Sequence, residues 1–423
     1  MDGLEIKDIF IIWKTMRFTV KIEKIVYGGY GLGYHEGKTV LVYKGMPGEV
    51  LEVEVVEDKK NVLFCIIPSK STCGACVFSE IDYPQQIEYK KLILNEIFKN
   101  IYSNIDMVSS PQVNYYRNKI TFSVEYAEDK VKIGMVENKS NKVIEYDSCL
   151  LYPAGITDLV NYFRDLLNNK PKVIQNITFR YNSDLSAIHI YFSSNQKFNI
   201  FTEEEISNIA TPPSPSQRGG NIVGIVFNDK VLYGEKYYYD KFAHLKLKIH
   251  FKAFYQTNTQ QAINIYQQIE KFIDVNEIVL DAYCGMGTIG LFISKKCKNV
   301  VCIDDDKSSI ISGLGNAKIN KIKNLQFVNK NCNNVLENLE KVNTVIVNPP
   351  RQGLNKKIIQ DICSLKINKV IYLSCDPMTL KRDILLFKDK GYNLNFLKGF
   401  DMFPHTWHIE TLALLKFNNG DKK

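Results

Sequence analysis

The chain has 423 residues, of which 45% are hydrophobic and 24% charged, and its formal net charge is +8. This balance is typical of a folded protein of two or three domains and excludes a largely disordered chain. No segment reaches the roughly 18 apolar residues of a membrane span, and the ten cysteines are scattered with no secretory signal. We therefore expect a cytoplasmic protein without membrane contact, whose positive charge suits a polyanionic partner.

Residues 17–69 are expected to form a small β-barrel. Short runs that favour strands alternate with turns, first at the glycine cluster 28–33 and then at Pro-Gly-Glu, 47–49. The glycine cluster opens no helix, so it does not indicate a dinucleotide-binding loop.

Residues 70–253 are expected to form a central domain that mixes helices and strands. The pattern predicts helices over 84–104 and 154–168, and strands over 119–126, 131–136, 188–192 and 222–228. The Pro- and Ser-rich stretch 211–220 predicts an exposed loop inside this domain.

From residue 254 onward, strands and helices alternate. Strands are predicted over 277–281, 299–303, 325–328, 344–347 and 369–374, with two more near 393–399 and 409–416. This order predicts a doubly wound, mostly parallel α/β sheet of the Rossmann-like kind. Ligands bind such sheets outside the carboxyl ends of the strands.

Two groups of complementary chemistry follow these predicted strands. Cys375 lies in Ser-Cys-Asp-Pro directly after the strand 369–374, and Glu410 ends Asp-Met-Phe-Pro-His-Thr-Trp-His-Ile-Glu at 401–410. A thiolate can attack a carbon atom, and a carboxylate can remove a proton. An isolated cysteine is more often a small buried hydrophobe, so this interpretation depends on the motifs around it.

A nucleotide-type site is predicted beside them. The first strand of the sheet leads into Asp-Ala-Tyr-Cys-Gly-Met-Gly at 281–287, whose glycines let a ligand approach the backbone closely. Asp304 ends the next strand, where an acidic residue typically holds ribose hydroxyls. Both NAD and S-adenosylmethionine (SAM) would fit, and we interpret the form Asp-x-x-Cys-Gly-x-Gly as favouring SAM.

Together these motifs resemble the class I SAM-dependent RNA uridine-5-methyltransferase family, from about residue 17 to the C-terminus. The likeness is also carried by Tyr-Arg-Asn-Lys at 116–119, Phe-Tyr-Gln-Thr-Asn at 254–258 and Asn-Pro-Pro-Arg-Gln-Gly-Leu at 348–354. The barrel is similar to the OB-like, RNA-binding TRAM domain. The resemblance implies a monomer of three domains: a TRAM barrel at 17–69, a central α+β domain at 70–253 and a methyltransferase domain at 254–423.

The resemblance also implies roles for single residues. Cys375 would be the nucleophile and Glu410 the base, while Arg117 and Phe254 would bind the target uridine. The implied SAM contacts are Gln256, Tyr283, Asp304 and Asn348. The expected reaction is methylation of uridine carbon 5 in structured RNA, with large-subunit ribosomal RNA as the substrate and the T-loop of tRNA as the alternative.

The chain departs from the family pattern in two respects. Asp304 stands where Glu is usual, and its shorter side chain still offers a carboxylate to the ribose. Asn348 stands where Asp is usual, and the lost charge would weaken SAM binding. Asn331 also stands where Asp is usual, which would change a contact near the adenine. Many members hold a [4Fe–4S] cluster with four cysteines, the first of which corresponds to Ile67 here. The remaining matches are Cys73, Cys76 and Cys149. We therefore expect no stable cluster and no other metal.

Two other functions remain open. Amino-group methyltransferases also use Asn-Pro-Pro, but usually with an aromatic residue next, where this chain has Arg351. Such enzymes need neither Cys375 nor Glu410. A catalytically weakened RNA-binding protein would be consistent with Asp304 and Asn348, and it should not bind SAM.

Overall fold

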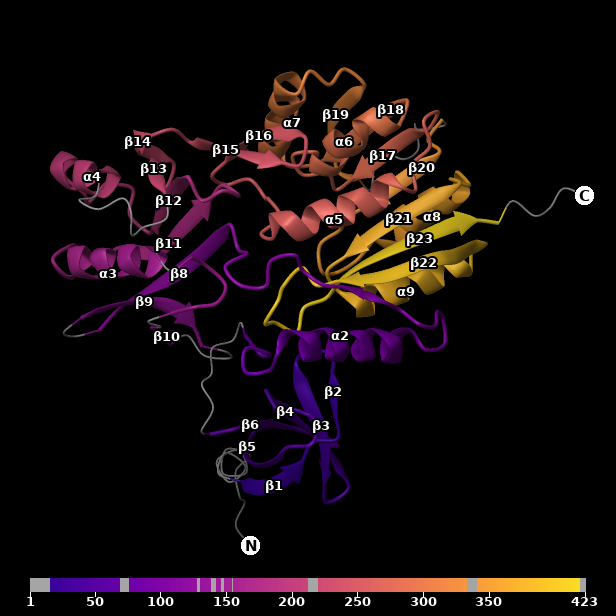
Figure 1. Ribbon diagram of the computed structural model, residues 1–423, viewed down its shortest axis with the longest axis horizontal. Helices are drawn as coiled ribbons and strands as arrows, with labels where there is room; N and C mark the ends of the chain where they lie inside the picture. Colours follow the sequence, from indigo (N-terminus) through magenta and orange to yellow (C-terminus); the bar gives the residue numbers. More distant parts are fainter. Residues whose placement is uncertain are drawn as a thin grey trace, which may run out of the picture. The chain divides into compact units, whose positions relative to one another are not determined.

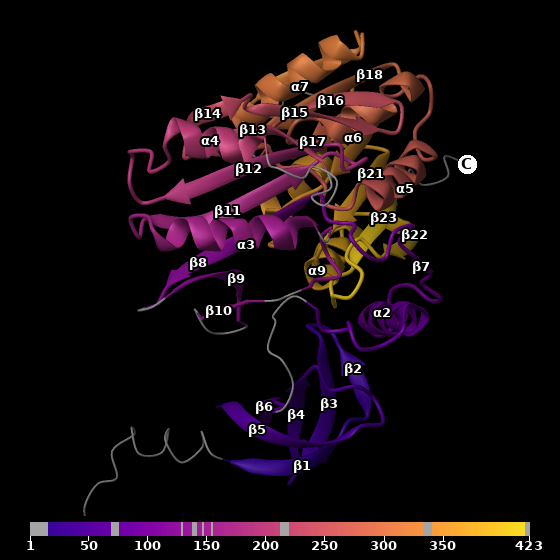
Figure 2. The same ribbon diagram turned by 60° about the vertical axis from the view of Figure 1, so that its left-hand side comes forward.

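The structure is a computed structural model that describes residues 16–68, 76–127, 130–137, 142–145, 148–153, 155–211, 220–332 and 341–418. The chain divides into two units, drawn in Figures 1 and 2. Unit 1 comprises the residues up to Met107 together with Phe403–His408. Unit 2 comprises Val108–Met402 and the residues from Ile409 onward. The three-domain boundaries drawn from the sequence stay a prediction.

Six strands of unit 1 form one sheet in the order β1-β5-β6-β4-β3-β2. They are β1 (Arg17–Lys21), β2 (Lys24–Val26), β3 (Tyr30–His35), β4 (Lys38–Tyr43), β5 (Val50–Lys59) and β6 (Val62–Ile66). Alternate apolar side chains of these strands, among them Val20, Val42 and Leu63, pack into one core because successive residues of a strand face opposite sides. The predicted strand-rich N-terminal region is confirmed.

Helix α2 (Tyr83–Phe98) follows the sheet in unit 1. It begins where the Asp82 side chain accepts a hydrogen bond from the Gln85 amide at 2.9 Å. The helix ends at Phe98, before the predicted end near residue 104. The side-chain amide of Asn95 makes two hydrogen bonds with the backbone of Ile105, at 3.0 Å each, so the chain folds back along the helix instead of extending it.

The first part of unit 2 is a seven-stranded sheet in the order β10-β9-β8-β11-β12-β13-β14. Its strands are β8 (Lys119–Tyr126), β9 (Val131–Val136), β10 (Val143–Ile144), β11 (Ile174–Tyr181), β12 (Ala187–Ser194), β13 (Asn221–Phe227) and β14 (Lys230–Gly234). Figure 2 shows α3 (Gly155–Asn168) lying along this sheet, where its apolar residues join the core. Helix α4 (Glu203–Ala210) follows, and residues 212–219 of the predicted loop lie outside the described residues.

The second part of unit 2 is a sheet in the order β19-β18-β17-β20-β21-β23-β22-β7. Its strands are β7 (Met107–Val108), β17 (Ile278–Ala282), β18 (Asn299–Asp304), β19 (Leu325–Asn329), β20 (Thr344–Val347), β21 (Lys369–Ser374), β22 (Tyr392–Phe400) and β23 (Glu410–Phe417). Strands β17 to β21 pair in parallel, whereas β23 runs antiparallel to both β21 and β22. The predicted doubly wound, mostly parallel sheet is confirmed.

Helices and a two-stranded ribbon flank this sheet (Figure 1). They are β15 (Tyr237–Phe242), β16 (Leu245–His250), α5 (Thr259–Glu270), α6 (Thr288–Ile293) with the 3₁₀ turn η2 (Ser294–Lys296), α7 (Lys307–Ile319), α8 (Lys356–Ser364) and α9 (Pro377–Lys388). All four residues of β20 are buried, as expected for a strand covered on both faces. Among the helices of the described residues, none is long and apolar enough to cross a membrane.

Candidate active site

The predicted cofactor contacts and the predicted nucleophile emerge at one edge of the β17–β23 sheet. Asp304 is the last residue of β18, and Tyr283, Asn348 and Cys375 directly follow β17, β20 and β21. These four strands are parallel neighbours, so their carboxyl ends lie next to one another. This is the edge at which open α/β sheets bind their ligands.

Glu410 comes to the same edge from the opposite direction. It begins β23, and the antiparallel register pairs Thr411 with Ser374 of β21. One residue beyond that pair, the two chains bring Glu410 opposite Cys375. The negative charge of Glu410 is close enough to contribute to the raised pKa of Cys375. The structure therefore brings the predicted nucleophile and the predicted base together.

The environment of Glu410 suits a group that exchanges a proton near neutral pH. Its side chain is 4% exposed, and burial raises its pKa to about 8. A general base is most effective when its pKa lies near the working pH, because it is then both deprotonated often enough and basic enough.

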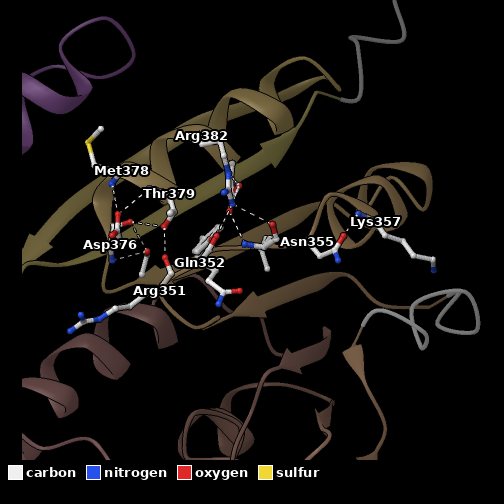
Figure 3. A network of polar contacts seen from close by, with 12 residues as sticks. Arg351, Gln352, Asn355, Lys357, Asp376, Met378, Thr379 and Arg382 are labelled. Carbon is white, nitrogen blue, oxygen red and sulfur yellow. Dashed lines mark hydrogen bonds and ion pairs between the residues drawn. The ribbon is translucent and has the colours of Figure 1, made fainter. Parts of the chain in front are cut away.

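Cys375 is half-buried, and its pKa is raised to about 11 by burial and then by the charge of Glu410, while the charge of Arg351 lowers it. The residue lies at the start of α9, where Asp376 accepts hydrogen bonds from the amides of Met378 and Thr379 at 2.9 and 3.0 Å (Figure 3). A helix N-terminus stabilises a nearby thiolate. Burial favours the protonated thiol of Cys375, whereas the charge of Arg351 and the start of α9 favour the thiolate.

The loop after β20 is fixed against α9 by the polar network of Figure 3. The hydroxyl of Thr379 donates to the carbonyl of Arg351 at 3.2 Å, and the guanidinium of Arg382 donates to the carbonyl of Gln352 at 2.9 Å. The Arg351 side chain itself extends away from these contacts. The network therefore holds the backbone of Arg351, while its cationic end remains outside the network and influences Cys375 electrostatically.

The loop after β17 leaves room beside Asp304. Tyr283 and Gly285 adopt φ of 60° and 54°, and a Cβ added at Gly285 would meet nothing within 4 Å. The Gly285 amide donates to the Asp304 carboxylate at 2.8 Å. A left-handed backbone with open space above it lets a ligand approach closely, and an oriented carboxylate can accept from ribose hydroxyls. These residues therefore fit SAM, the cofactor predicted from the sequence.

Gln256 forms a hydrogen bond with Tyr266, a residue that the sequence analysis did not identify. Tyr266 of α5 is 3% exposed. Burial raises its pKa first, the charges of Asp281 and Glu410 raise it further, and a hydrogen bond with Gln256 lowers it. Tyr266 thus connects a predicted SAM contact with the predicted base. From the sequence it is indistinguishable from an ordinary apolar helix position.

The segments that carry the two predicted uridine contacts lie against each other. The segment 116–119 lies against the segment 254–258, since Arg117 forms an isolated β-bridge with Asn258 and the Asn118 side chain donates to the Gln256 carbonyl at 2.8 Å. Phe254 is 68% exposed. An exposed aromatic ring is suited to stacking on an unpaired RNA base.

The cysteines of the possible iron–sulfur site are only partly described. Cys73 lies outside the described residues, whereas Cys76 and Cys149 are half-buried. Within the described ranges, no three His, Cys, Asp or Glu side chains are grouped to hold a metal ion. Ile67 and Cys65 both pack in the core of unit 1, and burial raises the pKa of Cys65 to about 12, so Cys65 is a poor substitute ligand. The expected lack of a cluster stays a prediction.

Comparisons with known proteins agree with this arrangement. The family model "tRNA (Uracil-5-)-methyltransferase" matches residues 82–418, and the TRAM domain matches residues 16–67. The chain is 31% identical to an uncharacterized RNA methyltransferase of Fusobacterium nucleatum, covering 94% of this chain and 95% of the relative. It is also 31% identical to one of Caldanaerobacter subterraneus, covering 94% and 98%.

The structure also resembles a solved one. The tRNA (uracil-54, C5)-methyltransferase of Pyrococcus abyssi, in complex with S-adenosyl-L-homocysteine, aligns with a TM-score of 0.74 at 23% identity, covering 95% of this chain and 100% of that chain. This likeness shows a shared fold. The family models match most of the chain and therefore show its family as well as its fold. The chain belongs to the tRNA (uracil-5-)-methyltransferase family and is a SAM-dependent RNA (uracil-5-)-methyltransferase with an N-terminal TRAM domain.

Proposed function

We propose that this protein methylates carbon 5 of a uridine in large-subunit ribosomal RNA, with Cys375 as the nucleophile and Glu410 as the base. The register of β21 and β23 carries the proposal, because it brings Cys375 opposite Glu410 at the edge that also holds Asp304 and Asn348. A nucleophile, a base and a cofactor site on one edge are what substitution at an unreactive ring carbon requires.

The proposed chemistry follows from the electronic character of uracil. The thiolate of Cys375 adds to carbon 6, and the electrons of the carbon 5–carbon 6 double bond make carbon 5 nucleophilic. SAM, which Gln256, Tyr283, Asp304 and Asn348 would hold, supplies the methyl group that carbon 5 receives. Glu410 then removes the remaining proton from carbon 5. The electrons of that C–H bond restore the double bond, and the sulfur of Cys375 leaves carbon 6 as a thiolate.

The target base has to leave any stack before both groups can reach it. Arg117 and Phe254 lie on segments that contact each other, and Phe254 is exposed, so we propose that both residues bind the unstacked base. Loops of folded RNA, in which bases are already unpaired, are therefore the expected targets.

The role of Cys375 can be tested with RNA that contains 5-fluorouridine. Carbon 5 of this nucleotide carries fluorine in place of the proton that the base removes, so the cysteine cannot be eliminated and the covalent complex persists. We expect the wild-type protein to form this complex in the presence of SAM and Cys375→Ala to form none. Cys363 of α8 is a matched control, since it is also half-buried and burial raises its pKa to about 11. Cys363→Ala should behave as wild type. A stable complex or normal methylation in Cys375→Ala would show that Cys375 is not the nucleophile.

The T-loop of tRNA is the second candidate substrate. The description of the matching family model and the activity named for the Pyrococcus abyssi enzyme both favour it. Mass spectrometry of ribosomal RNA and tRNA from a strain lacking this gene separates the two candidates. Loss of 5-methyluridine from ribosomal RNA alone would support the first, and loss from tRNA alone would support the second.

A further inference from the structure

The two-stranded ribbon β15–β16 of unit 2 has one buried face and one accessible face. Successive residues of a strand point to opposite sides, and the buried side takes Tyr238, Asp240, Phe242, Leu245, Leu247 and Ile249. The register pairs the residues of the other side, which we call the ribbon face: Tyr237 with His250, Tyr239 with Lys248 and Lys241 with Lys246. On the ribbon face Tyr239 is 45% exposed, and Lys241 and Lys246 are exposed as well.

The charges of the ribbon are divided between its two faces. Its one acidic residue, Asp240, is buried, where it accepts hydrogen bonds from the hydroxyls of Ser183 and Tyr255 at 2.6 and 2.9 Å. The ribbon face therefore carries three lysines and no acid. Two of them, Lys241 and Lys246, stand directly opposite each other, an arrangement that costs stability. An anionic partner that binds between them would remove this cost.

The lysines of the ribbon face are also ordered by its aromatic rings. The Nζ atom of Lys248 lies 4.4 Å from the ring centre of Tyr237, and that of Lys246 lies 5.1 Å from the ring centre of Tyr239. A ring attracts an ammonium group placed over it. Side chains that are already ordered lose less conformational entropy when they bind a partner. The ribbon face thus presents its positive charges in defined positions.

The ribbon face leads toward a proposed contact with the target base. β16 ends at His250, four residues before Phe254, which is at most about 14 Å of extended chain. Burial lowers the pKa of His250 first, and nearby positive charges, including those of Lys236 and Arg180, lower it further. Arg180 also donates to the Ala253 carbonyl at 2.8 Å. Positive charge therefore continues from the ribbon to the segment that carries Phe254.

We propose that the ribbon face binds the phosphate backbone of the RNA strand next to the target uridine, through Lys241, Lys246 and Lys248. This inference rests on the proposed function in one respect, since it takes Phe254 as a contact of the target base. It does not depend on the roles of Cys375 and Glu410. RNA is the polyanion that a member of this family acts on, and lysine contacts to phosphates position a strand without reading its sequence.

The test measures RNA affinity of the full-length protein at several salt concentrations, with a tRNA transcript and a large-subunit ribosomal RNA fragment. The double variant Lys246→Gln/Lys248→Gln removes two charges. It leaves the backbone amides through which α7 holds β16 (Figures 1 and 2). For the RNA that the wild type methylates, the slope of log affinity against log salt should become smaller by about 1.4 to 1.8. The affinity lost between about 50 and 200 mM salt should then be about tenfold less than in wild type.

Two controls separate charge from other effects. Lys246→Arg/Lys248→Arg keeps both charges and should keep the wild-type slope. Lys388→Gln should also keep it, because Lys388 is exposed at the end of α9 opposite to Cys375. An unchanged slope in the Gln double variant, or an equal change in Lys388→Gln, would overturn the proposal. If the double variant fails to bind SAM and is therefore misfolded, Lys241→Gln takes its place, with an expected change of about 0.7 to 0.9, and an unchanged slope is again decisive.

Cys375→Ala is measured in parallel, and it should bind RNA with the wild-type slope. If Cys375→Ala methylates RNA normally while the Gln double variant loses slope, the proposed mechanism is wrong and the ribbon face stands. If Cys375→Ala is inactive and the double variant binds RNA as the wild type does, only the ribbon face is wrong.

Discussion

Replacing Glu410 with Gln should make the protein more stable at alkaline pH even though it removes the proposed base. Burial raises the pKa of Glu410 from 4.5 to about 8. Because the folded-state pKa lies above the unfolded one, the folded protein binds this proton more tightly than the unfolded chain does. The stability that the protonated carboxyl contributes is therefore fully present below pH 4.5 and is lost as the pH rises through 8.

The size of the effect follows from the size of the pKa shift. A rise from 4.5 to about 8 is about 3.5 units, which corresponds to about 5 kcal/mol at 1.36 kcal/mol per unit. All of this is lost above about pH 9, and about 3 kcal/mol is already lost at pH 7, where the unfolded carboxyl is ionised and the folded one mostly is not. A glutamine has no proton to lose, so the variant should not show this decline.

Urea unfolding of the wild type and of Glu410→Gln across a pH series measures the difference between their free energies of unfolding. Relative to wild type, the free energy of unfolding of Glu410→Gln should rise by about 1 kcal/mol at pH 5 and by about 5 kcal/mol at pH 9, beyond any constant offset. A pH-independent difference for Glu410→Gln would refute the reasoning, since it would mean that the carboxyl is not held in an apolar environment.

Four further outcomes are expected. Arg351→Gln removes the charge that lowers the pKa of Cys375, so alkylation of Cys375 by iodoacetamide at mildly alkaline pH, followed by mass spectrometry, should slow; an unchanged rate would contradict this. Asn348→Asp adds a carboxylate to the edge that would hold SAM and should tighten SAM binding in calorimetry; an unchanged affinity would contradict this. Lys24 is exposed on β2, and Lys24→Ala should lower the slope of RNA affinity against salt by about 1; an unchanged slope would argue against RNA binding there. Anaerobically purified protein should lack a full [4Fe–4S] cluster, and about four irons per chain in iron and sulfide analysis would show otherwise.

The parallel sheet could be predicted closely because its strands are buried on both faces. The strands predicted over 344–347 and 369–374 begin and end at the observed residues of β20 and β21. The ribbon β15–β16 was not predicted, because its stability depends on α7: the side chains of Asn316 and Asn320 accept hydrogen bonds from the amides of Lys248 and Lys246 at 2.7 and 2.9 Å. That dependence on a distant helix leaves no local pattern in the sequence.

Helix α4 was also not predicted, although its sequence carries a recognisable helix start. Its start carries a capping box, in which Thr202 and Glu205 exchange hydrogen bonds at 2.8 and 3.2 Å. This signal is present in the sequence as Thr-Glu-Glu-Glu at 202–205, and it could have identified the helix.

Within the site, residues at strand ends were predictable and residues on helices were not. Cys375 and Glu410 follow or begin strands, so sheet topology places them at one edge. Tyr266 occupies an ordinary helix position, and the sequence does not show that Gln256 and Asp281 are its neighbours. Only the folded chain shows what such side chains contact, because periodicity reports burial and not the identity of the neighbour.

Two buried carboxyl groups near this edge of the sheet lower the stability of the fold when they ionise. Asp281 is 0% exposed and its pKa is raised to about 7 by burial, as the pKa of Glu410 is raised to about 8. A folded protein that keeps two such carboxyls gives up stability as they ionise, and the loss must be offset elsewhere. The offset lies in the strands paired with theirs: β20 beside β17, which carries Asp281, is buried throughout, and β21 beside β23, which begins with Glu410, is buried from Val370 onward. An apolar sheet interior with its reactive groups at the exits of the strands gives low polarity around each group and leaves the hydrogen-bond ladder between the strands intact.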